Sequence, residues 1–260
     1  NIEIIQSSSN LIFAVFKLGK IIRQYNPVIH CFLPKSYLIG GLLSILLSKN
    51  YLIMSRRSRN NYQKDRLFFK ILERFLHSKV DIALANSKIV FNDLLDEGFK
   101  KNKLKLIYNG VNLEDFKPNH YIRNETRLSY NIKQNDIVIL YIANYFRYKG
   151  HNDFIEALKL QENNFKNNFK IIFVGKDYGR LDKLKNKIHL YNMSDKFIFL
   201  NEETNVKEIF PASDIGVLAS YEEGFSNFVL EAMSTGLAMI ASRVGGNEEA
   251  IKNHESGLLF

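Results

Sequence analysis

Short apolar runs alternate with amphipathic segments along most of the chain. In the first half, the pattern predicts strands at 27–32, 51–55, 80–86 and 105–110. It predicts a helix after the first strand that runs to about Leu47, a second over 64–77, and a third from Ser87 to near Gly98. Short runs that are apolar on both faces are typical of parallel strands covered by helices on both sides. The first half is therefore predicted to be a series of strand–helix units.

A polar segment at 112–135, which contains Pro118, predicts a crossing segment with a short helix. The alternation then resumes, with strands predicted at 137–143, 170–175, 196–200, 214–220 and 237–242, and helices at 152–160, 179–190, 205–210 and about Ser226–Thr235. We predict an α/β fold of two Rossmann-like domains with parallel sheets, 1–112 and 113–260, facing a cleft. Ligands of such sheets bind at the carboxyl ends of strands, so we look for chemistry in the loops that follow strands.

Two further expectations concern packing in the first domain. In the predicted helix at 64–77, apolar residues recur at helical spacing, and we expect this stripe to pack on the sheet: Phe68, Ile71, Leu72, Phe75 and Leu76. His30 lies inside an apolar strand pattern and is expected to be a packed histidine, not a catalyst.

The composition is that of a globular protein. Of the 260 residues, 46% are hydrophobic and 24% are charged, which is enough apolar material for a sizeable core. Cys31 is the single cysteine, so an intramolecular disulfide is excluded and a reducing compartment is indicated. Lys49 and Asn50 interrupt the apolar region 37–54, which favours a buried helix followed by a strand over a membrane span. We find no signal peptide, and we expect both ends of the chain to be cut.

The positive charge lies in the first half. Residues 1–112 contain 18 Lys and Arg against 7 Asp and Glu, whereas the remainder contains 18 against 20. The stretch 55–66, with Arg56, Arg57 and Arg59, has three readings: it binds an anionic acceptor such as a lipid diphosphate, it rests on an acidic membrane, or it is a solvated face. Nucleic-acid binding rests on this charge alone, without a stacking motif or recognition helix, and we expect no nucleic-acid partner.

The stretch YEEGFSNFVLEAMSTG (221–236) places a loop between a predicted strand and a predicted helix. A helix amino terminus offers free N–H groups and a partial positive charge, which suit a phosphate. Gly224 allows close approach to a ligand, Glu223 precedes the helix, and Glu231 falls in its second turn. The spacing of the two glutamates is weak evidence by itself. Two carboxylates beside an anion-binding site, however, could accept hydrogen bonds from the hydroxyl groups of a sugar nucleotide.

The segment EGFSNFVLEAMSTGLAMIASRVGGNEEAI resembles the donor-binding signature of retaining glycosyltransferases of family 4, which have the GT-B fold. The segments ANSKIV to NGVNLEDF (85–116), YIANYFRYKGHNDFIEAL (141–158) and IIFVGKD (171–177) match further elements of that family in order. The similarity is clear from about residue 80 to 260 and fainter through 27–63.

The resemblance implies roles for individual residues. Glu223 is expected to hold the transferred sugar and Glu231 the ribose, while Arg147 and Lys149 stabilise the departing phosphate. The remaining donor-site residues implied are Gly175, Gly224, Phe225, Ser226 and Asn227. It also implies retention of configuration, with a phosphate oxygen taking the acceptor proton, and no metal and no cofactor beyond the sugar-nucleotide substrate.

The implied function is transfer of a sugar to a glycan or lipid-linked acceptor in surface polysaccharide or glycolipid synthesis. We expect a cytoplasmic enzyme with a peripheral contact at the inner face of the membrane. Two departures support an alternative, a catalytically degenerate module that only binds a nucleotide or glycan. Ala143-Asn144-Tyr145 replaces the Gly-Arg-Leu of many relatives, and Ser55-Arg56-Arg57 stands where many relatives carry a histidine.

Overall fold

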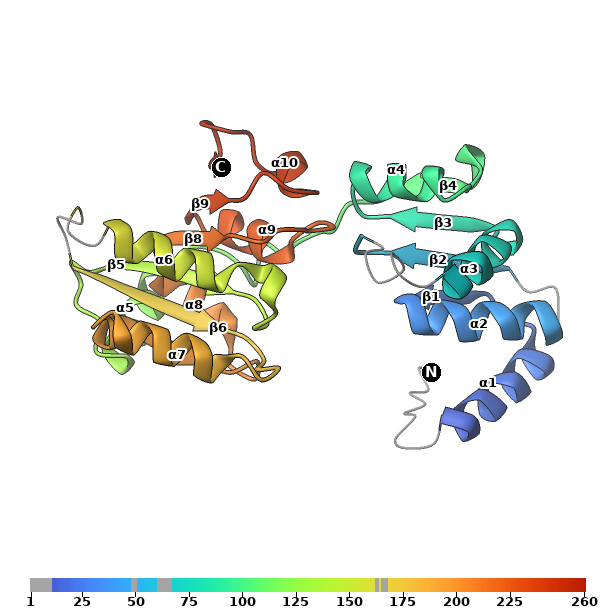
Figure 1. The fold of residues 1–260 in the computed structure, drawn as a ribbon, viewed down its shortest axis with the longest axis horizontal. Helices are drawn as coiled ribbons and strands as arrows, with labels where there is room; N and C mark the ends of the chain where they lie inside the picture. The colour runs from blue at the N-terminus through green and yellow to red at the C-terminus, as the bar shows by residue number, and fades with distance from the viewer. Residues whose placement is uncertain (1–10, 48–50, 60–66, 162–163, 165–167) are drawn as a thin grey trace. The chain divides into compact units, whose positions relative to one another are not determined.

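The computed structural model describes residues 11–47, 51–59, 67–161, 164 and 168–260, in two compact units, Asn1–Tyr108 and Asn109–Phe260 (Figure 1). The first unit contains a four-stranded parallel sheet in the order β1-β2-β3-β4. Its strands are β1 (Ile29–Phe32), β2 (Leu52–Arg56), β3 (Ile82–Ala85) and β4 (Leu104–Leu106). Its helices are α1 (Leu11–Tyr25), α2 (Pro34–Leu47), α3 (Leu67–Lys79) and α4 (Lys88–Asp96).

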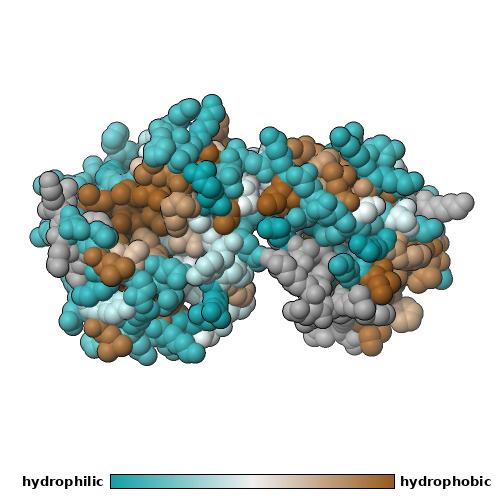
Figure 2. Space-filling view, turned by 45° about the horizontal axis from the view of Figure 1, so that its top comes forward, coloured by the Kyte–Doolittle hydropathy of each residue, from teal (hydrophilic) through white to brown (hydrophobic). Residues whose placement is uncertain are grey.

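The sequence pattern predicted most of these helices and strands. The predicted cap of α4 is confirmed, since the Ser87 hydroxyl accepts a hydrogen bond from the Val90 N–H. The region 37–54 is a helix followed by a strand, as predicted, and within the described residues no helix is long and apolar enough to cross a membrane. The pattern did not predict α1, whose residues Ile12, Phe13 and Phe16 are exposed. Figure 2 shows hydrophobic patches between hydrophilic areas on the face of the molecule that it presents.

The predicted buried face of α3 is confirmed for Leu76 and wrong for Ile71 and Phe75, while Leu72 is partly buried. Leu76 is buried, but Ile71 is 61% exposed and Phe75 is 50% exposed, while Glu73 and His77 face the core. Spacing by four residues places Glu73 and His77 on one side of the helix, where partners from other elements hydrogen-bond to both side chains. Phe68 lies outside the side chains that the structure describes.

The expected burial of His30 is wrong, whereas its lack of a catalytic role stays a prediction. Among the described strands β1 lies at an edge of its sheet, and the His30 side chain is exposed, with Nε2 2.7 Å from the Ser55 hydroxyl oxygen. An edge strand with an open face leaves such a residue in contact with solvent, which the apolar run around it does not reveal.

The second unit contains a six-stranded parallel sheet in the order β10-β9-β8-β5-β6-β7. Its strands are β5 (Ile137–Ile142), β6 (Phe169–Val174), β7 (Phe197–Leu200), β8 (Ile215–Leu218), β9 (Ala238–Ala241) and β10 (Leu258–Leu259). Its helices are α5 (His120–Ser129), α6 (His151–Gln161), α7 (Leu181–Leu190), α8 (Val206–Ala212), α9 (Asn227–Ser234) and α10 (Asn247–Ala250).

The chain order reverses beside β5. The strands β6 and β7 follow on one side of β5, whereas β8 and β9 follow on the other. Right-handed crossovers therefore put α6 and α7 on one face of the sheet and α8 and α9 on the other, and Figure 1 shows α6 and α7 together on one face. At such a reversal the loops diverge and leave room for a ligand beyond the strand ends. In this unit the loops that diverge are those after β5 and β8.

Candidate functional site

The loops after β5 and β8 are joined by backbone contacts and one tyrosine. A 3₁₀ turn at Arg147–Lys149 ends at Gly150, which has φ +72°. A Cβ atom at Gly150 would lie 1.8 Å from the Ala219 carbonyl oxygen, so only glycine fits there. The buried Tyr141 hydroxyl donates to the Lys149 carbonyl and accepts from the Ala219 N–H at 2.9 Å. The two loops are therefore held in one arrangement.

At this junction Lys149 and Glu223 form an ion pair. Lys149 Nζ lies 2.6 Å from Glu223 Oε1, and the two side chains are 18% and 10% exposed. The buried Ser220 hydroxyl donates to the same Oε1 at 2.7 Å. The structure thus brings together two residues that lie 74 positions apart in the sequence. The Glu223 carboxylate is held in place by contacts from both loops.

Two glycines that were not among the predicted site residues contact the backbone of the loop that carries Glu223. Gly245 has φ +55°, and a Cβ atom there would lie 1.9 Å from the Glu223 carbonyl oxygen. The Gly246 N–H donates to the Gly224 carbonyl at 2.9 Å. Sequence reasoning assigned these glycines no role, although the Gly-Gly pair within RVGGNEEAI was the available signal.

The helix α9 begins where the sequence predicted. The Ser226 hydroxyl accepts a hydrogen bond from the Val229 N–H at 3.5 Å and so caps the helix. The Asn109 side-chain amide donates to the Phe225 carbonyl at 3.0 Å and to Asn227 Oδ1 at 2.8 Å. These contacts fix the first turn of α9, whose remaining N–H groups can bind an anion.

Glu231, in the second turn of α9, is a half-buried carboxylate. Burial raises its pKa above the ordinary value. Among the described residues, no hydrogen bond or ion pair is formed by its carboxylate group. A partly desolvated acid without a protein partner is suited to accept hydrogen bonds from ligand hydroxyl groups.

Among the described residues, no hydrogen bond or ion pair joins Arg147 or Gly175 to the Lys149–Glu223 pair. Arg147 is exposed and lines a cavity whose lining includes neither Lys149 nor Glu223. Gly175 is buried after β6, where a Cβ atom would lie 2.2 Å from the Ala143 carbonyl oxygen. Its position is explained by close packing of the loops after β5 and β6.

In the first unit, Arg56 belongs to a buried ionic network. Its Nη1 donates to Glu97 Oε1 and Oε2 at 2.5 and 2.6 Å, and its Nη2 to Glu73 Oε2 at 3.2 Å. His77 Nε2 lies 3.1 Å from Glu97 Oε2, and His77 Nδ1 lies 2.9 Å from the Tyr37 hydroxyl. Burial is the main cause that lowers the His77 pKa. The Arg56 guanidinium group is therefore paired with buried carboxylates inside the first unit and does not face an acceptor or a membrane, as the sequence had predicted it to do.

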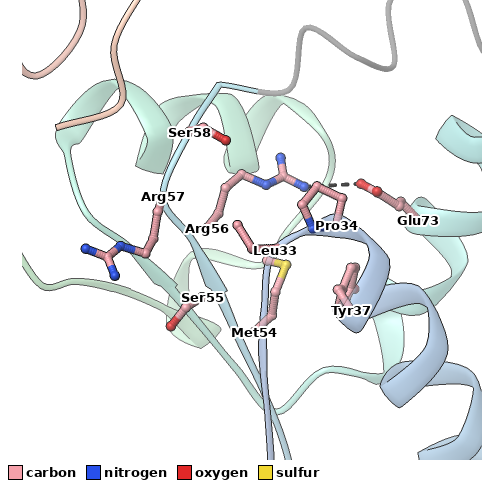
Figure 3. Close-up of a pocket in the computed structure, with 9 residues that line it drawn as sticks. All are labelled: Leu33, Pro34, Tyr37, Met54, Ser55, Arg56, Arg57, Ser58 and Glu73. Carbon is pink, nitrogen blue, oxygen red and sulfur yellow. Dashed lines mark hydrogen bonds and ion pairs between the residues drawn. The ribbon is translucent and has the colours of Figure 1, made fainter. Parts of the chain in front are cut away.

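Arg57 and Arg59, the other arginines predicted for the acceptor or membrane side, are exposed. Figure 3 shows Arg57 pointing away from Arg56, whose guanidinium group is directed toward Glu73. Arg59 is 39% exposed and pairs with Asp93 at 3.0 Å. The pocket in Figure 3, at the carboxyl ends of β1 and β2, has a volume of about 20 Å³ and is lined in part by Tyr37 and Ser55. This volume has room for one water molecule.

Glu73, His77 and Glu97 also have the geometry of a possible metal site, with ligand atoms within 4.8 Å of one another. The Arg56 guanidinium group already bridges the two carboxylates. A divalent cation there would face a buried positive charge at close range. The structure favours an ionic network over a metal centre at these residues.

Comparison with known proteins identifies the family. Residues 122–260 match the family model of glycosyl transferases group 1, and residues 3–115 match that of Glycosyltransferase Family 4. The chain belongs to the glycosyl transferases group 1 family. The family recognised from the donor signature is therefore confirmed.

Individual relatives are distant but extend over much of the chain. The N-acetyl-alpha-D-glucosaminyl L-malate synthase of Bacillus anthracis is 27% identical over 191 residues, which cover 72% of this chain and 48% of that relative. The UDP-Gal:alpha-D-GlcNAc-diphosphoundecaprenol alpha-1,3-galactosyltransferase of Escherichia coli is 27% identical over 270 residues, covering 100% of this chain and 68% of that relative. This glycosyltransferase chain thus spans between about half and two thirds of the length of these relatives.

The crystal structure of Anabaena Alr3699/HepE in complex with UDP has the same fold. It superposes with a TM-score of 0.82 at 20% identity, covering 95% of this chain and 67% of that one. Together with the two parallel sheets, this likeness confirms the predicted α/β fold class and the GT-B fold of the family.

Proposed function

We propose that the protein is a retaining glycosyltransferase that moves a sugar from a nucleotide-sugar donor to a glycan or lipid-linked acceptor in surface polysaccharide or glycolipid synthesis. The observation that carries the proposal is the ion pair between Lys149 and Glu223, in which Glu223 lies in the loop that leads into the capped amino terminus of α9. The relatives support it by name, since one takes UDP-Gal to a diphosphoundecaprenol acceptor and the solved neighbour was crystallised with UDP and with UDP-glucose.

In this proposal the donor diphosphate lies at the amino terminus of α9. Lys149 moves from Glu223 to the phosphate, and the Glu223 carboxylate then accepts hydrogen bonds from the sugar hydroxyl groups. Glu231 accepts hydrogen bonds from the ribose diol. The free N–H groups of the first helical turn and the helix dipole supply further positive potential.

The reaction breaks the bond between the sugar anomeric carbon and the leaving phosphate oxygen. The acceptor hydroxyl forms the new bond on the face that the phosphate leaves, and its proton passes to a phosphate oxygen. Lys149 and the α9 N–H groups stabilise the negative charge that develops on the phosphate. We propose that this stabilisation needs no metal ion, so chelation with EDTA should leave the transfer rate unchanged.

A lipid-linked acceptor would place the reaction at a membrane surface. We propose that the enzyme works at the cytoplasmic face of the membrane, where exposed cations of the first unit such as Arg57 contact acidic lipid headgroups. Co-sedimentation with vesicles of phosphatidylglycerol tests this, with phosphatidylcholine vesicles as control. Equal binding to both would contradict the electrostatic contact.

Calorimetry with UDP, UDP-glucose and GDP tests the donor site on the whole chain. Lys149→Ala and Glu223→Ala should weaken binding of the preferred nucleotide sugar, and Lys149→Ala should lower the transfer rate by about 10²–10³. Lys252→Ala removes a cation that is 80% exposed and should change neither. Full transfer in both site variants would overturn the assignment.

The alternative, a degenerate module that binds a nucleotide or glycan without turnover, predicts a different result. Tight binding that depends on Lys149, with no transfer to any acceptor in a panel of lipid diphosphates and glycans, would support that alternative. The mutual position of Lys149 and Glu223 favours turnover, because the site keeps both the cation for the leaving group and the carboxylate for the sugar.

A further inference from the structure

The two oxygen atoms of the Glu223 carboxylate have different surroundings. Oε1 accepts two hydrogen bonds, from Lys149 Nζ at 2.6 Å and from the Ser220 hydroxyl at 2.7 Å. Across the described residues no hydrogen bond reaches Oε2, and this atom is not fully buried. A carboxylate oxygen has about two lone-pair sites, so the protein fills those of Oε1 and leaves those of Oε2 for a ligand.

The two groups that hold Oε1 differ in how they respond to a bound nucleotide sugar. In the proposed function Lys149 moves to the diphosphate, so its hydrogen bond to Oε1 is lost. Ser220 lies in the loop after β8, three positions before Glu223, and is 1% exposed. Because its side chain is short and buried, Ser220 cannot follow the phosphate. Of the two, only the Ser220 hydroxyl keeps its contact with Oε1.

Ser220 is itself anchored by hydrogen bonds that do not involve Lys149. Its carbonyl accepts from the Ser242 hydroxyl at 2.5 Å, and the Asn247 side-chain amide donates to the Ser242 carbonyl at 3.0 Å. Ser242 and Asn247 are both buried, at 8% and 0% exposure. Separation of Lys149 from Glu223 therefore leaves these bonds, and the position of the Ser220 hydroxyl, intact.

We propose that Ser220 is a positioning residue for Glu223 and contributes to selectivity for the sugar part of the nucleotide sugar. After Lys149 has moved to the phosphate, the Ser220 hydroxyl holds Oε1 and so directs Oε2 toward the hydroxyl groups of the sugar. The inference rests on the proposed transferase function, because it requires that Glu223 binds the transferred sugar.

Calorimetry with two ligand pairs tests the proposal on the whole chain: UDP-glucose with UDP, and GDP-mannose with GDP. The pair that binds the wild type more tightly is used, and the ratio of nucleotide-sugar affinity to nucleotide affinity reports the sugar contact. Ser220→Ala should lower this ratio about tenfold and leave nucleotide affinity within about twofold of the wild type. A general loss of structure would weaken both ligands alike, so the ratio separates positioning from folding.

Ser213→Ala is the matched control. Ser213 is also buried, and its hydroxyl donates to the Ile209 carbonyl at 2.9 Å, directly after α8. This variant removes a buried hydroxyl group that does not contact Glu223, so it should lower the melting temperature and keep the wild-type ratio.

Two further variants make the test specific. Ser220→Cys fills a similar space with a weaker hydrogen-bond donor, so its ratio should lie between those of the wild type and Ser220→Ala. It also gives the readout if Ser220→Ala fails to fold. In the double variant, Ser220→Ala should not lower the ratio below that of Glu223→Ala alone, because the group that Ser220 holds is then missing.

The possible failures point to different errors. A wild-type ratio in Ser220→Ala and Ser220→Cys, together with a lowered ratio in Glu223→Ala, would overturn the role of Ser220 and leave the proposed function standing. Equal losses for nucleotide and nucleotide sugar would show that Ser220 only supports the fold. A wild-type ratio in Glu223→Ala, or no binding of either ligand pair, would contradict the proposed function itself and the inference with it.

Discussion

Lys149 Nζ lies 2.6 Å from Glu223 Oε1, so two residues assigned to different parts of the donor are bonded to each other. Each satisfies the charge of the other in a site that is mostly shielded from water. A donor phosphate would have to replace Glu223 as the partner of Lys149, which leaves the carboxylate available for sugar hydroxyl groups. The ion pair therefore keeps both groups in place before the ligand arrives.

A double-mutant cycle should measure this pairing. We expect Lys149→Met and Glu223→Gln to be coupled by about 1–3 kcal/mol in the free energy of unfolding, because each single change leaves a largely buried group without its partner. Urea unfolding of the two single variants and the double variant gives the coupling. Additive effects would show that the pair does not contribute to the stability of the second unit.

Glu231 should make nucleotide binding depend on pH. Its pKa is raised by burial, so protonation removes the charged acceptor at a higher pH than for an exposed glutamate, and UDP affinity should decrease as the pH falls through that pKa. Glu231→Gln should bind UDP about tenfold more weakly at neutral pH and lose this pH dependence. Calorimetry with 2′-deoxy-UDP is the control, since the missing hydroxyl should weaken binding to the wild type but not to Glu231→Gln. An equal loss in both proteins would contradict the ribose contact.

Gly150 should be far less tolerant of alanine than Gly179. Both have positive φ, but a Cβ atom at Gly150 would strike the Ala219 carbonyl, whereas nothing lies within 4 Å at Gly179. Gly179→Ala should cost only the conformational strain of about 1–2 kcal/mol, and Gly150→Ala should cost at least about 3 kcal/mol. Urea unfolding provides the comparison. Similar losses for both would mean that the loops after β5 and β8 adjust freely.

The stability of the protein should decrease in acid partly because of His151. Its pKa is about 4 in the folded state against 6.5 as the reference, so the unfolded chain binds a proton that the folded chain does not. The contribution is fully present above pH 6.5 and is lost as the pH falls toward 4, by about 3 kcal/mol. Unfolding of His151→Gln should show a correspondingly flatter pH dependence over this range. His189→Gln, at an exposed position, is the control and should follow the wild type.

Arg56 should be a stability residue of the first unit. Arg56→Met leaves Glu73 and Glu97 without their bridging cation, and we expect a loss of about 3–5 kcal/mol in the free energy of unfolding. Arg59→Met, three positions later, removes a 39% exposed cation and should have a much smaller effect. Denaturant unfolding compares the two. Equal effects would mean that the buried network contributes little.

Much of the fold could be predicted from the sequence because buried parallel strands have a distinct apolar pattern. The strand–loop–helix pattern also predicted the start of α9, since its capped first turn lies where the pattern put it. Pairing between distant residues could not be predicted in this way. Lys149 with Glu223, and Arg56 with Glu97, are brought together by sheet order, which periodicity along the chain does not contain.

Another miss has a similar origin. On α3 the apolar residues outnumber Glu73 and His77, so periodicity gave both of these residues to the solvent side. Partners from α2, β2 and the end of α4 make the burial of Glu73 and His77 favourable.

The contact of Gly245 with the Glu223 carbonyl has a consequence for evolution in this family. A side chain at Gly245 would displace the loop that carries Glu223, and a displaced loop would remove the need for glycine. Changes at the two places should therefore be inherited together. Recombination that joins the 221–224 segment of one homologue to the 244–246 segment of another should yield active enzymes only when both parents share this backbone contact.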